Sequence, residues 1–542
     1  MEKMSSNPLL RFRRSAAQLH ALAEVERTIR ATDTKCRRKY LRDFSEAFQT
    51  YRRVLPYPEL ERKLHGADVV LVGDYHALPA SQRFTAELIR RLAASGKTIV
   101  LGVEAIVARD QRILDEWQRG EIDTQELCSR IRFETDWGYD WQPFRELLET
   151  ARALGAPIFG LDCTPRNDMR SIRARDQHAA AKIAELRKAY PEAQLVVLFG
   201  ESHLAPTHLP MLVRDARPKD EIVTVLQNID SLYWLSAGEP QDLVEAVEVR
   251  DDVVCVFSAT PLEKYEHYRL CIERWKQTRA GTLDLAPSFY NLIDSLFRFL
   301  NVNLYATRGR CLVDELPEVW SVTSEEQLER LLARRMSTRI SEVRQMVERQ
   351  GSWFVGERNV IVAREFRMPW AAEQAARFVH HACRSNVSKY QSPEDAFYGR
   401  IVETALAFLG SKILCPSRKL YDESQLRGEY GKPEEQLPAL MTIRAFRQVL
   451  DAVLQHRRHS AEVYSSAVAL DTHRRELAIQ LLGHLLGSDL YRAYINGRLS
   501  RRFLRGLFFR DLAKRGDARA IYVRATRMAA MGAPQIRLRM VS

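Results

Sequence analysis

The sequence predicts a three-layer α/β domain with a parallel sheet, followed by a largely α-helical C-terminal region. The first observation is a series of short, almost continuously apolar runs between residues 68 and 257, which are typical of strands buried on both faces. The second is that helical patterns separate these runs, as they do in βαβ units. The third is that the alternation stops near residue 265, after which helical patterns dominate.

Residues 1–64 predict a helical N-terminal arm. Residues 11–53 contain neither glycine nor proline, and their apolar positions recur at helical spacing. Pro56 and Pro58 follow, and proline interrupts the backbone hydrogen bonds that a helix needs. We therefore expect the helical arm to end before the α/β domain begins.

The α/β domain is expected over residues 65–265. Its six predicted strands are residues 68–73, 98–103, 157–161, 194–199, 222–226 and 252–257. Its predicted helices are residues 81–94, 110–119, 141–154 and 168–190. Because each helix lies between two strands, the pattern predicts parallel pairing with helices on both faces of the sheet.

Residues 266–542 predict a mostly helical region. The helical segments are residues 288–301, 324–336, 339–350, 368–384, 396–410, 442–458 and 474–487. Residues 352–366 are the exception, because two β-rich runs flank Gly356–Asn359 and predict a hairpin. This hairpin either covers a helical core or forms a winged-helix element with the two helices before it.

The composition is that of an ordinary globular chain. Of 542 residues, 46% are apolar and 28% are charged, which excludes disordered, collagen-like and low-complexity classes. The sequence contains no uncharged apolar run of about 18 residues and no signal-peptide pattern, so we expect no transmembrane segment. The eight cysteines are widely spaced and predict reduced thiols, which favours a cytoplasmic protein.

The net charge of +12 is concentrated at the two ends of the chain. Residues 1–64 carry +7 and residues 498–542 carry +10, whereas the remaining body carries −5. The basic tail also has a predicted apolar stripe, made of Leu499, Phe503, Leu504, Leu507 and Phe508. Such a tail either docks on an anionic membrane surface or an acidic partner, or packs its stripe on the helical core of the protein itself.

Three predicted strands end in residues that carry chemistry. The motifs Gly73–His76 and Gly200–His203 both read G-x-x-H with an acidic residue after the glycine, and Glu104 follows the second strand. Glycine permits a sharp turn at the sheet edge. Because parallel strands share one carboxyl edge, we expect His76, Glu104 and His203 to converge there.

Two imidazoles and a carboxylate are compatible with several functions. They form a plausible divalent-metal site, a general acid–base site, or a site for a bound cofactor. Phosphate-binding loops, dinucleotide fingerprints, nucleophile elbows and kinase signatures do not occur in the sequence, which disfavours nucleotide-dependent enzymes and serine hydrolases.

The same region resembles the ChaN-like haem-binding uptake proteins of the Tiki superfamily, over residues 66–265. The resemblance is carried by VVLVGDYHALPASQRFTAELIRRL, IVLGVEAI, DWGYDWQPFRELLETARALGAPIFGLDCTPR, RDQHAAAKIAEL and LVVLFGESHL. Asp74 stands where the family usually has glutamate. The resemblance implies a bacterial protein that binds haem or a related ligand. It adds as ligand-binding candidates Asp74, Tyr75, Tyr139, Asp162, Arg166 and Glu201.

Three hypotheses follow. The domain binds haem or a related ligand at the carboxyl edge of its sheet, with His76, Glu104 and His203 nearest to it. Alternatively, these three residues hold a divalent metal ion and catalyse hydrolysis, as in peptidase- or esterase-like members of the superfamily. In the third, the chain is an intracellular sensor or scaffold with basic helical ends. We also expect a small-molecule ligand and a homodimer.

Overall fold

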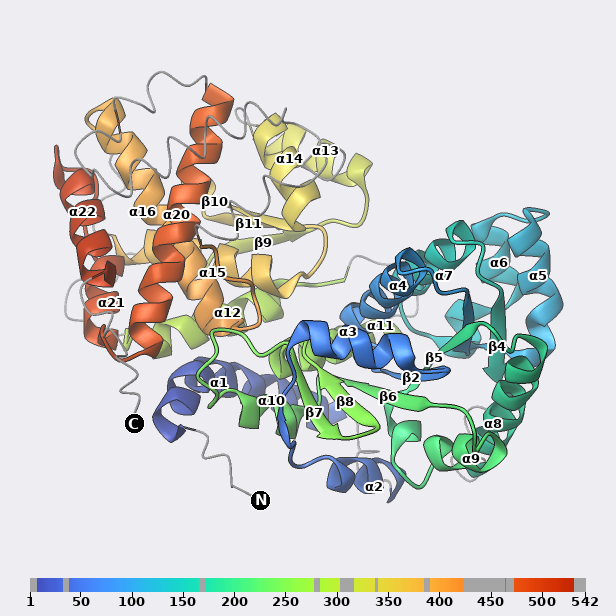
Figure 1. Cartoon of the computed structure of the whole chain (residues 1–542). Coiled ribbons are helices and arrows are strands. Elements are labelled where there is room, and N and C mark those ends of the chain that lie inside the picture. Colours follow the sequence, from blue (N-terminus) through green and yellow to red (C-terminus); the bar gives the residue numbers. More distant parts are fainter. Residues whose placement is uncertain are drawn as a thin grey trace, which may run out of the picture. The chain divides into compact units, whose positions relative to one another are not determined.

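A computed structural model describes residues 7–32, 39–164, 172–276, 283–302, 316–336, 340–384, 390–422, 464 and 472–530 (Figure 1). The chain divides into two compact units. The first unit comprises Met1–Arg11 and Leu22–Ala280, and the second comprises Phe12–Ala21 and Gly281–Ser542. Helix α1 (Pro8–Thr32) thus contributes residues to both units.

The first unit is built on an eight-stranded sheet with the order β1-β7-β8-β6-β2-β5-β3-β4. Its strands are β1 (Arg53–Val54), β2 (Val69–Asp74), β3 (Ile99–Val107), β4 (Ile158–Asp162), β5 (Gln194–Gly200), β6 (Ile222–Gln227), β7 (Ala246–Arg250) and β8 (Val253–Val256). The six strands from β8 to β4 pair in parallel, as the sequence predicts, and β7 and β1 add an antiparallel edge.

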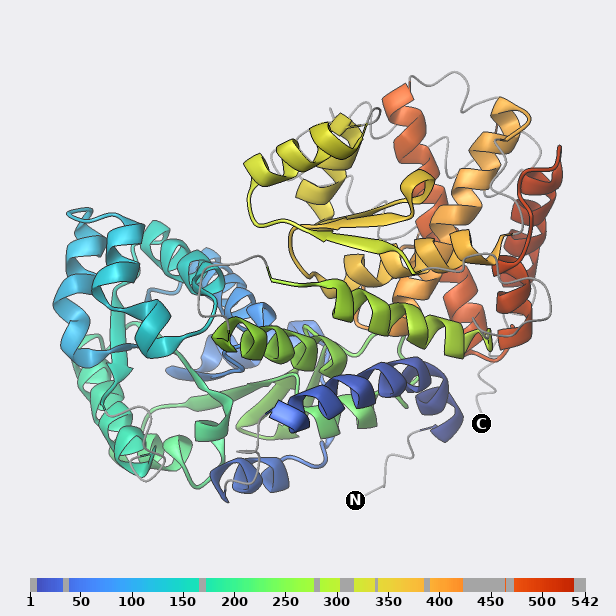
Figure 2. The same ribbon diagram turned by 180° about the vertical axis from the view of Figure 1, so that it is seen from behind.

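Helices cover both faces of this sheet (Figures 1 and 2). They are α2 (Lys39–Ala47), α3 (Tyr57–Gly66), α4 (Pro79–Ala94), α5 (Gln111–Arg119), α6 (Thr124–Arg130), α7 (Trp141–Ala153), α8 (Ile172–Ala189), α9 (Leu209–Ala216), α10 (Asp230–Ser236) and α11 (Pro261–Lys276). In one apolar core, helices α3, α4, α5, α6 and α7 pack against the face of the sheet on which β2 carries Val70 and Val72. In the other core, helices α2, α8, α9 and α10 pack against the opposite face, on which β2 carries Val69 and Leu71. The predicted three-layer α/β fold is confirmed.

Two details of the sheet differ from the prediction. Strand β3 runs on to Val107, although its pairing with β5 ends at Val103 and its register with β4 shifts beyond that residue. Glu104 therefore lies within the strand instead of after it. Strands β1 and β7 are not predicted, because one has only two residues and the other, AVEVR, has charged residues among its valines.

The second unit is largely helical, as expected. Its helices are α12 (Ala286–Phe299), α13 (Glu325–Arg335), α14 (Ile340–Gln350), α15 (Met368–Cys383), α16 (Pro393–Leu414), α20 (Thr472–Ile495), α21 (Arg501–Phe508) and α22 (Asp517–Ala530). The expected helix over 442–458 lies outside the described residues. Strands β10 (Ser352–Val355) and β11 (Val360–Ala363) form an antiparallel hairpin, and β9 (Glu318–Ser321) pairs with β11 in parallel.

The apolar stripe of the basic tail is largely buried within the second unit. Leu499, Leu504, Leu507 and Phe508 are buried, and Phe503 is half-buried. Arg501, Arg502 and Arg505 of α21 are exposed. Thus the stripe packs on the unit's own core, and docking of the tail on a membrane or an acidic partner stays a prediction. Within the described ranges, every helix is too short or too polar to cross a membrane.

Candidate functional site

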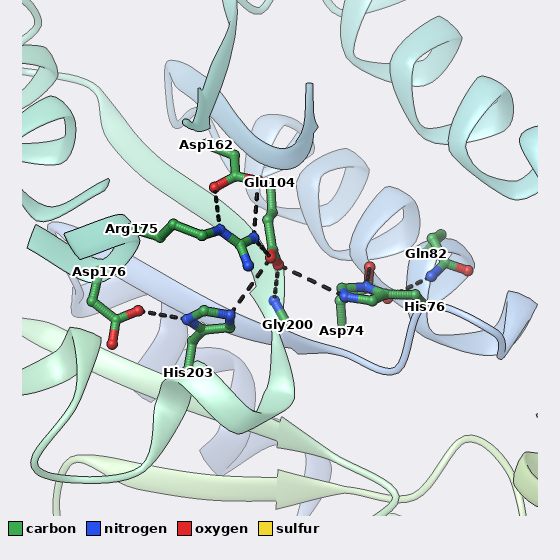
Figure 3. A network of polar contacts seen from close by, with 9 residues as sticks. All are labelled: Asp74, His76, Gln82, Glu104, Asp162, Arg175, Asp176, Gly200 and His203. Atoms are coloured by element: carbon green, nitrogen blue, oxygen red, sulfur yellow. Dashed lines mark hydrogen bonds and ion pairs between the residues drawn. The ribbon is translucent and has the colours of Figure 1, made fainter. Parts of the chain in front are cut away.

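The strand order brings the predicted site residues together at the carboxyl edge of the sheet (Figure 3). Strand β5 lies between β2 and β3, with Asp74 opposite Gly200 and Val103 opposite Leu198. His76 follows β2 by two residues, and His203 lies in the short 3-10 helix Glu201–Leu204 that follows β5. The two histidines therefore reach Glu104 from the ends of two adjacent strands.

Each histidine is oriented by its own carboxylate. Nδ1 of His76 donates to Oδ2 of Asp74 over 2.8 Å, and Nδ1 of His203 donates to Oδ1 of Asp176 over 2.5 Å. A carboxylate at Nδ1 fixes the tautomer and the direction of the ring. Both Nε2 atoms consequently face Glu104, at 3.9 Å from Oε2 for His76 and 3.6 Å from Oε1 for His203.

Glu104 is held as a carboxylate between several donors. The backbone N–H of Gly200 donates to its Oε2, and Nη2 of Arg175 donates to its Oε1 over 2.6 Å. Burial alone would raise the pKa of Glu104, but the charges of His203, His76 and Arg175, together with the Gly200 N–H, lower it to about 2. The site thus contains a permanent buried negative charge.

Arg175 connects this glutamate to a second buried carboxylate. Its Nε and Nη2 donate to Oδ1 and Oδ2 of Asp162, at 2.8 and 2.9 Å. The guanidinium thus sits between two acids, Glu104 and Asp162, that are 3% and 0% exposed. Their attraction outweighs the cost of burial and raises the pKa of Arg175 further above its usual range.

His76 is the most accessible member of the network. Its side chain is 21% exposed, whereas that of His203 is 5% exposed. Burial lowers the pKa of His76, but Asp74 and Glu104 outweigh this effect and raise it above the ordinary value. For Asp74 the balance is the reverse, because burial raises its pKa more than the His76 charge and the Gln82 amide lower it.

Residue 200 has to be glycine, because the neighbouring side chains leave no room for a Cβ atom. A Cβ atom on Gly200 would lie 2.9 Å from Oε2 of Glu104 and 3.2 Å from one ring carbon of each histidine. Both imidazoles and the glutamate thus approach the glycine so closely that a side chain at this position would displace them. The glycine of the second G-x-x-H motif is explained by this close approach, because its φ of −49° is accessible to any residue.

Two aromatic side chains contact the ring of His76. The ring of Trp137 lies 4.5 Å from that of His76, and the ring of Tyr139 lies 5.2 Å from it. Both aromatic residues belong to the loop around Gly138, whose φ of 79° is in the left-handed region that favours glycine. This loop places two flat apolar surfaces beside the accessible imidazole.

The remaining predicted residues divide between two places. Asp74 and Asp162 belong to the same network as the two histidines, and Tyr139 lies beside His76. Tyr75 and Glu201 instead contact Lys264 of α11, whose Nζ lies 4.4 Å from the Tyr75 ring centroid and 3.1 Å from Oε1 of Glu201. Arg166 lies outside the described residues.

Sequence reasoning missed Arg175 and Asp176. Both lie in the first turns of α8 and are buried, at 8% and 2% exposure. A charged pair on an amphipathic helix normally indicates a solvated face. The available signal was that both residues stand in RDQH, at the beginning of one of the segments that carry the family resemblance.

The geometry does not favour a bound divalent ion. Among the described ranges, no group of three or more His, Cys, Asp or Glu side chains is arranged to hold a metal. The physical reason is that each oxygen of Glu104 already accepts a hydrogen bond, and one donor is a guanidinium whose charge repels a cation. The three expected ligands converge, but both oxygens of Glu104, the only carboxylate among them, already have hydrogen-bond partners.

The first unit is therefore a three-layer α/β domain with a polar site at the carboxyl edge of its sheet. Residues 60–196 match the model of a family described as haem-binding uptake, Tiki superfamily, ChaN. The match confirms the predicted resemblance and contains every charged partner in the network except His203. It covers only part of the chain and ends before the second G-x-x-H motif.

Two solved structures are similar to the chain at 15% identity. One shows cofacial haem binding to ChaN of Campylobacter jejuni, with a TM-score of 0.26 over 32% of this chain and 86% of that one. The other is the type III effector HopBA1, with a TM-score of 0.30 over 39% of this chain and 96% of that one. No curated protein matches the sequence.

Proposed function

We propose that the first unit binds haem at the carboxyl edge of its sheet, with His76 as the residue that meets the iron. The observation that carries the proposal is the state of this imidazole. It is partly exposed, its Nδ1 is bound to Asp74, and aromatic rings flank it. Histidines that ligate metals characteristically donate their other ring nitrogen to a carboxylate in this way.

The surrounding residues fit such a ligand. Bound haem would supply an iron atom that a histidine or tyrosine side chain can ligate. Trp137 and Tyr139 offer apolar faces for a flat ring beside the imidazole. The family description of the matched segment agrees with this ligand.

The test is a titration of the full chain with haemin, followed by its absorption spectrum. We expect a Soret band for the wild type, and a shifted band with weaker binding for His76→Ala. His65→Ala is the matched control, because this histidine is exposed on α3 of the same unit. A spectrum and affinity that His76→Ala leaves unchanged would refute the role of His76.

Two further variants resolve the ligand. Asp74→Asn removes the charge that orients the imidazole, and we expect about 10–100-fold weaker haemin binding, the usual cost of losing such a partner. Tyr139→Phe keeps the ring and removes only the hydroxyl. A Soret shift in Tyr139→Phe but not in His76→Ala would make Tyr139 the iron ligand instead.

A metal-dependent hydrolase is less well supported at the same residues. A divalent ion would have to displace the Arg175 guanidinium from Glu104, against the charge-assisted bond of 2.6 Å. We therefore expect added Zn²⁺ to leave the thermal unfolding temperature unchanged. A rise with Zn²⁺ that His203→Ala abolishes would favour the hydrolase over haem binding.

A further inference from the structure

Helix α11 stands outside the matched segment, yet it contacts the loops that carry the site. Lys264, Tyr268 and Trp275 lie four and then seven residues apart along the helix, so that they share one face. Lys264 and Tyr268 both contact Tyr75, the neighbour of His76 in the chain, at 4.4 and 6.2 Å. Trp275 contacts Tyr139, at 5.4 Å between ring centroids.

The helix is pinned in this position by a buried ion pair. Nζ of Lys264, which is 5% exposed, donates to both carboxylate oxygens of Glu201, at 3.1 and 3.2 Å. It also lies 3.8 Å from Oδ1 of Asp230. Because Glu201 directly follows Gly200, this pair fixes α11 to the end of β5 and hence to the site.

Trp275 is exposed and nevertheless fixed. It is 47% exposed, but its Nε1–H donates to the carbonyl of Gly138 over 2.6 Å. Its ring also lies 6.1 Å from that of Tyr268, in edge-to-face geometry. The hydrogen bond and the ring contact hold the Trp275 side chain in place, while nearly half of its surface remains open to a ligand.

The aromatic contacts form a continuous row that leads to His76. From the imidazole the row runs through Tyr139 to Trp275 and then to Tyr268, with consecutive ring centroids 5.2, 5.4 and 6.1 Å apart. The row thus joins the segment around Tyr139, which precedes β4 in the chain, to helix α11, which follows β8. Its chemistry suits a flat, conjugated ring system, which gains dispersion energy over its whole face.

We infer that Trp275 of α11, together with Tyr139, forms one wall of the ligand site. These two side chains select planar tetrapyrroles by contact with the face of the macrocycle, independently of any iron ligand. The inference rests on the proposed haem-binding function and adds to it residues beyond the matched segment. It separates two contributions to binding: the wall recognises the macrocycle, and His76 recognises the iron.

The experiment uses two probes on the full chain, haemin and iron-free protoporphyrin IX, with affinities taken from absorption and fluorescence titrations. We expect Trp275→Ala to weaken both probes by about tenfold, the range that aromatic stacking contributes. His76→Ala should weaken haemin only. Leu154→Ala is the matched control, since it truncates another exposed apolar side chain of the same unit, and it should change neither affinity.

Trp275→Leu guards against a folding defect, because it keeps apolar volume but removes the ring, and thermal unfolding verifies the fold of each variant. If both Trp275 variants bind protoporphyrin IX as the wild type does, the proposed role of Trp275 is refuted. The role of His76 in haemin binding would be unaffected by that result. Conversely, if the Trp275 variants weaken binding of both probes and His76→Ala does not weaken haemin binding, only the role of His76 as iron ligand is refuted. A wild type that binds neither probe overturns both.

Discussion

Arg175 is the residue whose removal should most disturb the site. Its guanidinium makes three hydrogen bonds of 2.6–2.9 Å to Glu104 and Asp162, two carboxylates that are essentially buried. The variant Arg175→Met keeps an unbranched side chain as far as the position of Nε and removes the charged guanidinium group. It leaves two buried acids without the cation that neutralises them.

The magnitude follows from that burial. Removing one partner of a buried ion pair costs about 3–5 kcal/mol. For a domain of this size each kcal/mol lowers the unfolding temperature by about 2–4 °C, so we expect a decrease of roughly 10 °C. Calorimetry on the full chain measures it. The control is Arg173→Met, two residues earlier on α8, where the side chain is exposed.

The pH dependence of this variant gives a second signature. The pKa of Glu104 is lowered to about 2, below its ordinary 4.5, so its ionisation stabilises the native state above pH 4.5. That stability is lost as the pH falls towards 2. Without Arg175 the contribution shrinks, so the difference between wild type and variant should be largest at neutral pH and narrow on acidification. A loss no greater than that of Arg173→Met, or one independent of pH, would refute the reasoning.

Three further predictions concern other positions. Gly200→Ala should lower the unfolding temperature by an amount that corresponds to about 1–3 kcal/mol and weaken haemin binding, because the new methyl group meets Glu104 and both imidazoles, whereas Gly66→Ala meets no atom within 4 Å and should leave haemin binding unchanged. His484 is buried and burial lowers its pKa to about 3, so the second unit should lose stability as the pH falls from 6.5 towards 3, and equal acid sensitivity in His484→Gln would contradict this. Leu504→Ala should cost about 2–5 kcal/mol in chemical denaturation, since this residue is fully buried, and Arg505→Ala should cost little.

Much of the fold could be predicted because its signals are local. A strand buried on both faces is a continuous apolar run, and β2, β5 and β6 lie within one residue of their expected ends. The convergence of His76, Glu104 and His203 was also predictable. Parallel strands present their carboxyl ends at one edge, so residues after several strands must meet there.

Other features depend on pairings that no local pattern encodes. Strand β5 lies between β2 and β3, and this order places Gly200 between the two imidazoles. Strands β1 and β7 pair with each other across a long separation in sequence, and neither stands out locally, because β1 has two residues and charged residues interrupt the apolar run of β7.

The sequence alone therefore determined the α/β class, most of the strand ends and the principal polar residues, because each follows from apolar periodicity and from the shared edge of parallel strands. Only the tertiary structure decided the partners of those residues. In the sequence, Arg175 and Asp176 resemble solvated helix positions. In the structure both are buried, and they bind Glu104 and His203. Trp275 reaches Tyr139 only because α11 folds back over the site, and the free energy of such long-range contacts is not written in any local sequence window.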